Sequence, residues 1–312
     1  MSPTFTEYVM RRLFQLSVLC LAAGVLSACY PDQIVNTENI PTAGIRFINA
    51  VPDSSGAFGF DMRFVDIVES NTQFYMTFRD APTQTVTSGT TDTLIIGSKL
   101  QFKGARVGSR HFRIFLSDTL QSIASTVIVD STVTLVADHN YTFILWGNGR
   151  SPKGAADAMH LSVLDEAPAD PGNQVGLRVI NATSAAIDAR AYTRGTAVPS
   201  TPTWASVAPY SASTWVNQAP GMIDYNIRAA GGTTAMFTDR LALPGAAAFS
   251  SAGTGGKLDI EASPGTLVAG SAVTVIVFPR SVAGARTPQG GAFSIPNVVT
   301  MWDRRPPRPP GV

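Results

Sequence analysis

The sequence predicts an all-β protein made of two tandem immunoglobulin-like β-sandwich domains that follow a lipoprotein signal peptide. Three observations lead to this prediction: a composition rich in turn and strand residues, a short phrase that occurs twice, and an apolar leader that ends in a cysteine. Of the 312 residues, 27 are Gly and 21 are Pro, and helix-favouring runs of Glu, Lys, Leu and Gln are nearly absent. A β-barrel is the alternative architecture.

The N-terminal segment has the features of a signal peptide. Arg11 and Arg12 precede the apolar stretch LFQLSVLCLAAGVL, which covers residues 13–26. This stretch is short for a membrane-spanning helix, which needs about 20 apolar residues. We therefore expect residues 1–28 to be removed. The alternatives are an ordinary signal peptide cut after a small residue, or an uncleaved anchor.

The end of the leader resembles a bacterial lipobox, in which small residues precede a cysteine that is lipidated. Leu26, Ser27 and Ala28 stand before Cys29 in this order. The resemblance implies that Cys29 carries lipid and becomes the mature N-terminus. The other cysteine, Cys20, lies in the leader, so the mature chain can form no internal disulfide.

The lipid would decide where the protein resides. Each buried methylene adds about 0.8 kcal/mol to membrane binding, so a multiply acylated cysteine is held stably. Tyr30 follows Cys29, in place of the Asp that marks inner-membrane retention in many Gram-negative lipoproteins. We therefore expect a lipid anchor in the outer membrane.

The net charge of +1 provides no basic surplus of the kind that nucleic-acid binding needs.

The repeated phrase indicates a domain duplication. GIRFINA at 44–50 matches GLRVINA at 176–182, and YTFILW at 141–146 matches VTVIVF at 273–278, with the same spacing between copies. Each copy is about 125 residues long, well above the length of solenoid repeats, which run about 20–50 residues. Each copy also has a segment that makes it longer than the other copy at that point, 77–92 in the first and 244–265 in the second. The residues inserted there are expected to form loops. The predicted organisation is a linker at 29–42, a first domain at 43–166, a second linker at 167–174, a second domain at 175–302 and an Arg/Pro-rich tail at 303–312.

Alternating apolar patterns and β-branched residues predict short strands in both copies. In the first copy the expected strands are 44–49, 58–67, 73–78, 93–96, 99–103, 110–116, 122–129, 132–136, 141–146 and 159–164. In the second copy they are 176–181, 187–192, 204–207, 212–217, 223–229, 234–240, 257–261, 273–278 and 298–302. So many short strands are typical of a sandwich.

The second copy resembles DUF4397, a family of uncharacterised domains from bacterial envelope proteins. The resemblance rests on GLRVINATSAAIDARAY, with Arg178, Asn181 and Asp188, on APGMIDYNIRAAG, with Gly221 and Tyr225, and on the final AVTVIVF. It covers most of the second copy and about half of the first. The family carries no known catalytic residues, so the resemblance implies no chemistry.

The sequence contains no pattern typical of a catalytic or metal site, and we expect no cofactor. His111, His139 and His160 are isolated in the sequence, and no zinc or EF-hand spacing occurs. Arg46 and Arg178 would either form a paired ligand contact or, as we favour, pack their stems and reach solvent or a carboxylate. Asn49 and Asn181 are expected to bond nearby backbone at the strand ends.

Five residues are candidate surface contacts. Two are tryptophans in polar contexts and three are arginines of the tail: Trp204, Trp215, Arg304, Arg305 and Arg308. The tail would dock to a partner or to an anionic envelope polymer, or it would simply be solvated.

These features predict a non-catalytic cell-envelope lipoprotein with a binding, adhesion or structural role. Its partners would be the membrane, through the lipid, and an envelope polymer or protein. One alternative is an envelope glycan- or peptide-processing enzyme whose site is assembled in space. Another is an accessory subunit of an outer-membrane complex.

Overall fold

The computed structural model describes eleven segments of the chain: residues 40–53, 59–69, 74–79, 84–88, 92–96, 102–117, 120–150, 154–166, 168–253, 256–282 and 295–307. Within them the two helices are a four-residue α2 (Gln121–Ala124) and a three-residue 3₁₀ helix η1 (Ala155–Asp157). Neither helix in the described part is long and apolar enough to cross a bilayer. Residues Pro41–Val312 form one compact unit.

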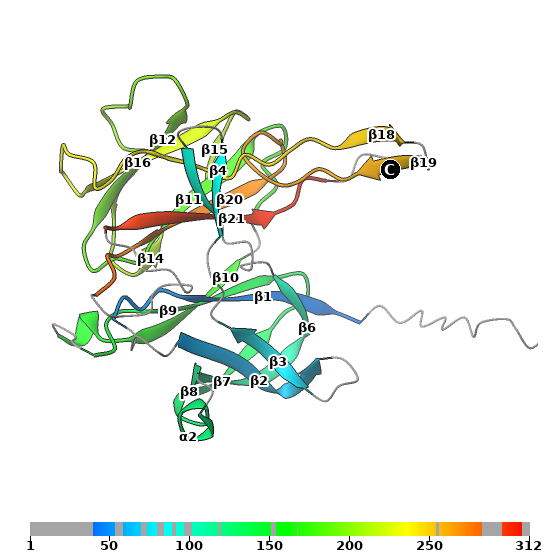
Figure 1. Cartoon of the computed structure of the whole chain (residues 1–312), viewed down its shortest axis with the longest axis vertical. Coiled ribbons are helices and arrows are strands. Elements are labelled where there is room, and N and C mark those ends of the chain that lie inside the picture. The colour runs from blue at the N-terminus through cyan, green and yellow to red at the C-terminus, as the bar shows by residue number, and fades with distance from the viewer. Residues whose placement is uncertain are drawn as a thin grey trace, which may run out of the picture. The chain divides into compact units, whose positions relative to one another are not determined.

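The described part is almost entirely β-structure, which confirms the predicted fold class (Figure 1). The strands of the first half, residues 41–166, are β1 (Thr42–Asn49), β2 (Gly59–Glu69), β3 (Phe74–Arg79), β4 (Gln84–Ser88), β5 (Asp92–Ile96), β6 (Lys103–Arg106), β7 (Gly108–Ser117), β8 (Val127–Leu135), β9 (Asn140–Trp146) and β10 (His160–Glu166).

The second half, residues 168–307, continues this pattern of short strands. They are β11 (Val175–Asn181), β12 (Ile187–Thr193), β13 (Trp204–Val207), β14 (Ser211–Ala212), β15 (Val216–Gln218), β16 (Ile223–Ala229), β17 (Arg240–Leu241), β18 (Phe249–Gly253), β19 (Gly256–Ile260), β20 (Ala272–Phe278) and β21 (Asn297–Arg304).

In each half, two sheets enclose one hydrophobic core. In the first half, the β1 sheet has the order β10-β9-β1-β6 and the β2 sheet has the order β3-β2-β7-β8. One cluster contains buried residues from both sheets, among them Ile45, Phe64 and Phe143. Aromatic rings fill this core: Phe143 makes edge contacts with Phe112 and Phe64, at centroid distances of 5.1 and 6.1 Å. Burial of such apolar faces is the main stabilising contribution to a sandwich.

The second half repeats this layout. The β11 sheet has the order β14-β11-β20-β21-β5-β4, and the β12 sheet has the order β13-β12-β16-β17. Leu177 and Val275 from the first of these sheets share a buried cluster with Ile187 and Tyr225 from the second. The repeated sequence phrases thus occupy corresponding strands of two sandwiches.

The two halves agree in strand register as well as in order. β1 runs parallel to β9 with Gly44 opposite Asn140, and β11 runs parallel to β20 with Gly176 opposite Ala272. β10 and β21 then flank these pairs in antiparallel fashion. The shared register accounts for the equal spacing of the repeated phrases. The exact domain boundaries drawn from the sequence remain predictions.

The central strands β1, β9, β11 and β20 are buried on both faces. Alternate residues face the sandwich cores, and the residues between them form a third cluster that contains Ile48, Ile144, Ile180 and Ile276. Because this cluster draws on both the β1 sheet and the β11 sheet, it joins the two halves. Double burial also explains why YTFILW and VTVIVF are continuous apolar runs without alternation.

Several sequence-based predictions of local structure were wrong. The segment 77–92, expected to be a loop, contributes β4, and β4 pairs with β5 at the edge of the second half's β11 sheet. The segment 244–265 contains the β18–β19 hairpin: β19 matches the strand predicted at 257–261, whereas β18 lies in the part expected to be a loop. A strand predicted at 122–129 begins instead with α2, and strand 234–240 is replaced by the two-residue β17. Local sequence patterns do not record which segments pair in a sheet, so β4 and β18 were not predicted from them.

The last strand also extends further than the sequence predicts. The last strand was expected to end at residue 302, but β21 continues through Asp303 to Arg304. Asp303 is 3% exposed, so the predicted tail at 303–312 starts inside the fold. The extension places Asp303 inside the fold, where it pairs with Arg46 and Arg178.

Candidate functional site

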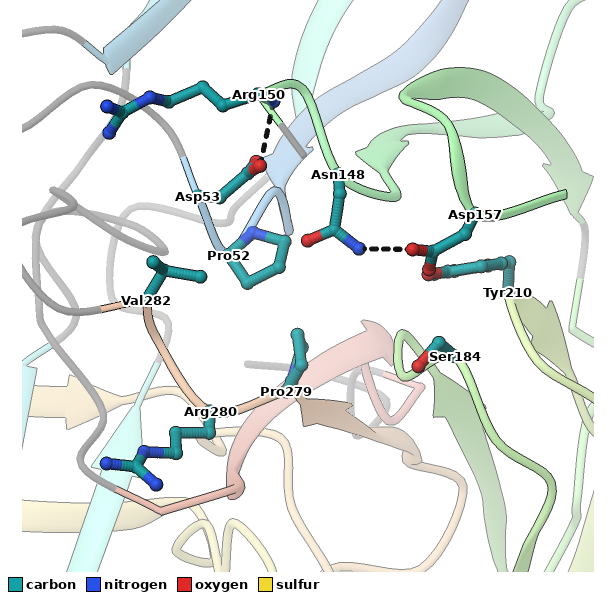
Figure 2. Close-up of a pocket in the computed structure, with 10 residues that line it drawn as sticks. All are labelled: Pro52, Asp53, Asn148, Arg150, Asp157, Ser184, Tyr210, Pro279, Arg280 and Val282. Carbon is teal, nitrogen blue, oxygen red and sulfur yellow. Dashed lines mark hydrogen bonds between the residues drawn. The ribbon is translucent and has the colours of Figure 1, made fainter. Parts of the chain in front are cut away.

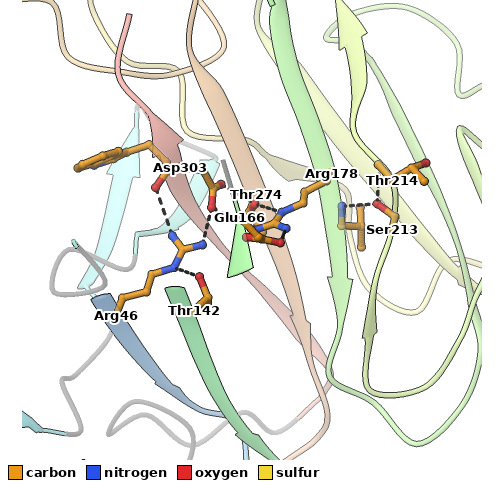
Figure 3. A network of polar contacts seen from close by, with 10 residues as sticks. Arg46, Thr142, Glu166, Arg178, Ser213, Thr214, Thr274 and Asp303 are labelled. Atoms are coloured by element: carbon orange, nitrogen blue, oxygen red, sulfur yellow. Dashed lines mark hydrogen bonds and ion pairs between the residues drawn. The ribbon is translucent and has the colours of Figure 1, made fainter. Parts of the chain in front are cut away.

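Arg46 and Arg178 occupy corresponding positions in β1 and β11, and both are only 1% exposed. Each donates its Nε–H to a threonine on the neighbouring parallel strand. Arg46 donates to Thr142 at 2.8 Å, and Arg178 donates to Thr274 at 2.6 Å. From the sequence we expect these side chains either to form a paired ligand contact or, as favoured, to reach solvent or a carboxylate. Figure 3 shows that the guanidinium groups meet carboxylates.

The carboxylates come from Glu166 in β10 and Asp303 in β21. Arg46 forms an ion pair with Asp303, which belongs to the second half, and Arg178 binds Glu166, which belongs to the first. Arg178 also contacts Asp303 at 3.1 Å, and Thr274 donates to the same carboxylate at 2.5 Å. The two halves are therefore linked by ion pairs that cross between them. We call these six residues the junction network: Arg46, Thr142, Glu166, Arg178, Thr274 and Asp303.

Aromatic rings cover the outer faces of both guanidinium groups. The Cζ atom of Arg46 lies 4.4 Å from the ring centre of Phe102, and that of Arg178 lies 4.5 Å from the ring centre of Trp215. Burial lowers the pKa of Arg178 to about 10, and the charge of Asp303 opposes this effect. Arg178 therefore remains charged at neutral pH, and the carboxylates of Glu166 and Asp303 compensate its charge.

Asn49 and Asn181 end β1 and β11 as predicted. The side-chain oxygen of each accepts the backbone N–H two residues further on, from Val51 and Thr183, at 3.0 Å in both cases. These contacts turn the chain directly after each strand. The loops that follow approach the ends of β9 and β20, because the strands of each pair are parallel.

A cavity of about 550 Å³ lies where these strands end. Its lining comes from the loops after β1, β9, β11 and β20 and from the segments around η1 and β14 (Figure 2). We call this cavity the junction pocket, and it is lined by Pro52, Asp53, Asn148, Arg150, Asp157, Ser184, Tyr210, Pro279, Arg280 and Val282. The lining includes three pairs of corresponding positions: 52 and 184, 148 and 280, 150 and 282.

Hydrogen bonds fix the acidic part of the pocket. The carboxylate of Asp53 accepts the backbone N–H groups of Gly149 and Arg150, each at 2.7 Å. Asp157 accepts the hydroxyl of Tyr210 at 2.7 Å and the amide of Asn148 at 2.8 Å. Burial, together with the bond to Asp157, raises the pKa of Tyr210, so its hydroxyl stays protonated at neutral pH.

The predicted tryptophan contacts lie differently from expectation. Trp204 is 5% exposed, stacks on Tyr225 at a centroid distance of 6.0 Å and donates its indole N–H to the Thr214 carbonyl at 2.9 Å. The prediction that it is a surface contact is therefore wrong, because the polar context of PTWASV hid a core position. Trp215 is half-buried, and Arg178 covers its ring.

The tail arginines are only partly described. Arg304 pairs with Asp170 at 2.7 Å, and the exposed Arg305 lies over the ring of Trp302 at 4.9 Å. Arg308 and the lipobox residues 26–29 lie outside the described residues. Their predicted roles therefore remain predictions.

Each histidine has a separate partner. His111 contacts Asp130, His139 contacts Asp165 at 2.7 Å, and Nδ1 of His160 lies 2.8 Å from the Ala158 carbonyl oxygen. Within the described residues no group of three metal-ligating side chains occurs.

The sequence does not single out Glu166, Asp303 or any part of the junction pocket. It predicts Glu166 at a domain border and Asp303 in the tail, since nothing local distinguishes a buried carboxylate from a solvated one. The available signal was the pair of apolar strands that each carry one arginine, because a buried guanidinium requires an acceptor.

Comparisons with known proteins add little to this description. No family model matches the chain, and no curated protein matches it, so the resemblance to DUF4397 stays a prediction. One similar solved structure is a protein of Bacteroides fragilis whose description assigns it provisionally to cell adhesion. It is 10% identical, the alignment covers 87% of this chain and 100% of that chain, and the TM-score is 0.17.

Proposed function

We propose that this chain is a non-catalytic binding protein of a bacterial cell envelope, held at the outer membrane by lipid on Cys29. The lipobox at residues 26–29 supports the anchor and the compartment. The separate partners of the three histidines support a role without catalysis, since among the described residues none of these histidines is hydrogen-bonded to a serine or threonine that could act as a nucleophile.

One observation carries the binding role: the junction pocket is lined by loops from both halves of the chain. Ligand sites occur preferentially at such junctions, and cavities of about 300–1,000 Å³ suit small ligands. The third cluster holds the two halves together beside the pocket, since Ala50, Ala182 and Phe278 belong to it and directly precede the pocket loops. The junction network joins the halves further along the same strands. The ligand would therefore bind to a largely preformed site.

Fractionation of cells tests the anchor. In cell fractions washed with high salt, which weakens any remaining binding to the envelope, Cys29→Ala should move the protein from the outer-membrane fraction to a soluble fraction. Cys20→Ala should leave it in the membrane. An unchanged distribution of the Cys29→Ala protein would overturn the anchoring proposal.

Occlusion of the pocket tests the binding role. Ser184 is exposed at the pocket wall, so Ser184→Trp should fill part of the cavity without disturbing a core. Isolated cell envelopes should retain less of the Ser184→Trp protein than of the protein with the native Ser184. Each protein in this comparison also carries Cys29→Ala, so that lipid does not contribute to retention. The matched control is Ser131→Trp on the exposed surface of β8. Equal retention of all three proteins would contradict a binding role for this pocket.

A further inference from the structure

The charges around the junction pocket are not equivalent to one another. Both oxygens of Asp53 accept backbone N–H groups, and both oxygens of Asp157 accept side-chain donors. These carboxylates are thus engaged by the protein itself. These donors are neutral, so each carboxylate keeps its negative charge, but one hydrogen-bonding position on each of its oxygens is already occupied.

The two arginines of the pocket are placed differently. Arg150 and Arg280 follow β9 and β20, and both are exposed. Within the segments that the structure describes, neither guanidinium group forms an ion pair, and Figure 2 shows both groups on the side of the pocket where Val282 lies. In Figure 2 the two groups lie at opposite ends of that side, with Val282 between them. An exposed guanidinium without an ion pair favours an anion, and it binds a carboxylate through two parallel hydrogen bonds.

The remaining lining has a mixed character. Pro52, Pro279 and Val282 provide apolar walls, whereas Ser184 and Asn148 present a hydroxyl and an amide on the opposite side from the guanidinium groups. A ligand that fits must carry an acidic group at one end, polar groups able to bond Ser184 and Asn148 at the other, and a compact body between them.

Building on the proposed binding function, we infer that the junction pocket binds a small polyhydroxylated acid, such as a uronic acid sugar, with its carboxylate on the side of the pocket that carries Arg150 and Arg280. The hydroxyl groups of the sugar would bond Ser184 and Asn148, and its ring would lie against the prolines. The cavity of about 550 Å³ has room for one or two sugar rings.

Calorimetric titration of the full chain in detergent with D-glucuronate tests this inference. We expect saturable binding that weakens about tenfold or more in each of Arg150→Gln and Arg280→Gln, because each removes a charge-assisted contact. Binding should also weaken as the salt concentration rises. Arg113→Gln, on β7 and away from the pocket, is the matched control and should bind as the wild type does. Thermal unfolding of each variant verifies that it is folded.

Two further ligands separate the outcomes. Glucose carries the hydroxyl groups without the charge and should bind far more weakly than glucuronate. Equal binding of glucose and glucuronate, abolished by Ser184→Trp, would overturn the acidic ligand but leave the binding function standing. Tighter binding of glucose 6-phosphate would replace the carboxylate by a phosphate and overturn the proposed class. Absence of glucuronate binding at millimolar concentration would likewise overturn the inference, whereas the envelope-retention experiment decides the binding function independently.

Discussion

Asp303 is the acceptor that the two halves share. It receives an ion pair from Arg46, a contact from Arg178 at 3.1 Å and a hydrogen bond from Thr274 at 2.5 Å, all at a buried position. Removal of one partner from such a cluster leaves the others charged and desolvated, which costs more than the contact itself contributed.

We therefore expect Asp303→Ala to lower the free energy of unfolding by about 3–5 kcal/mol. Urea denaturation at pH 7 measures this loss. Asp170→Ala removes an exposed carboxylate that pairs with Arg304, and it should change stability by less than about 1 kcal/mol. A comparable effect of the two variants would show that the junction network contributes no more than a surface pair.

Tyr225 presents the opposite case, a buried hydroxyl without a partner among the described residues. Because burial without a hydrogen bond is unfavourable, Tyr225→Phe should raise the free energy of unfolding by about 1 kcal/mol at pH 7. Burial also raises the pKa of Tyr225. Above about pH 10 the unfolded chain loses this proton while the folded chain keeps it, so stability falls as the pH rises.

The Phe variant lacks this ionisation, so its advantage over the wild type should grow above pH 10. Urea denaturation of both proteins at neutral and alkaline pH measures the difference. A gap that stays constant with pH, or a less stable variant at pH 7, would contradict this account of Tyr225.

At the scale of single strands, β1 and β11 each contain a glycine at the start of the repeated phrase, Gly44 and Gly176. Neighbouring atoms lie closer to Gly44 than to Gly176. A Cβ atom on Gly44 would lie 2.2 Å from Oδ1 of Asn140 and 3.2 Å from Cβ of Phe102. A Cβ atom on Gly176 would meet its nearest neighbour, in Ala272, at an ordinary 3.5 Å. The same substitution should therefore have opposite effects in the two strands.

We expect Gly44→Ala to destabilise the protein by about 1–3 kcal/mol through overpacking. Gly176→Ala should be neutral or stabilise it by up to about 1 kcal/mol, because alanine restricts the unfolded chain. The two thermal unfolding midpoints provide the comparison. Similar shifts in both variants would show that the two strands are packed alike.

The strands also show how far the sequence predicts this fold. The repeated phrases and apolar runs predicted β1, β9, β11 and β20, since buried central strands carry strong local patterns. The same patterns could not reveal β4 at the edge of a sheet built by the other half, or the burial of Trp204 in a polar context. They also could not bring Arg46 to Asp303, because that contact spans 257 positions and depends on the packing of two sheets.

At the scale of the molecule, the third cluster and the junction network join two sandwiches into one compact unit. We therefore expect a single cooperative thermal transition, with equal calorimetric and van't Hoff enthalpies. Ile180 lies in the third cluster and is 0% exposed, so Ile180→Glu should uncouple the halves and split or broaden the transition.

Val163→Glu, on β10 and 37% exposed, is the control for the added charge and should keep a single transition. Two separate transitions in the wild-type protein would show that the halves unfold independently despite their shared cluster.

The crossed pairs of Arg46 with Asp303 and of Arg178 with Glu166 have the form of an isologous dimer interface, in which each copy offers the same group to the other. Fusion of two such copies into one polypeptide makes their association independent of protein concentration. The two halves of a fused chain also no longer need to have the same sequence. Ser184 can stand where the first copy has Pro52, and Arg280 where it has Asn148. A homodimer would have to line its central pocket symmetrically, whereas this fused chain can shape an asymmetric pocket for an asymmetric ligand.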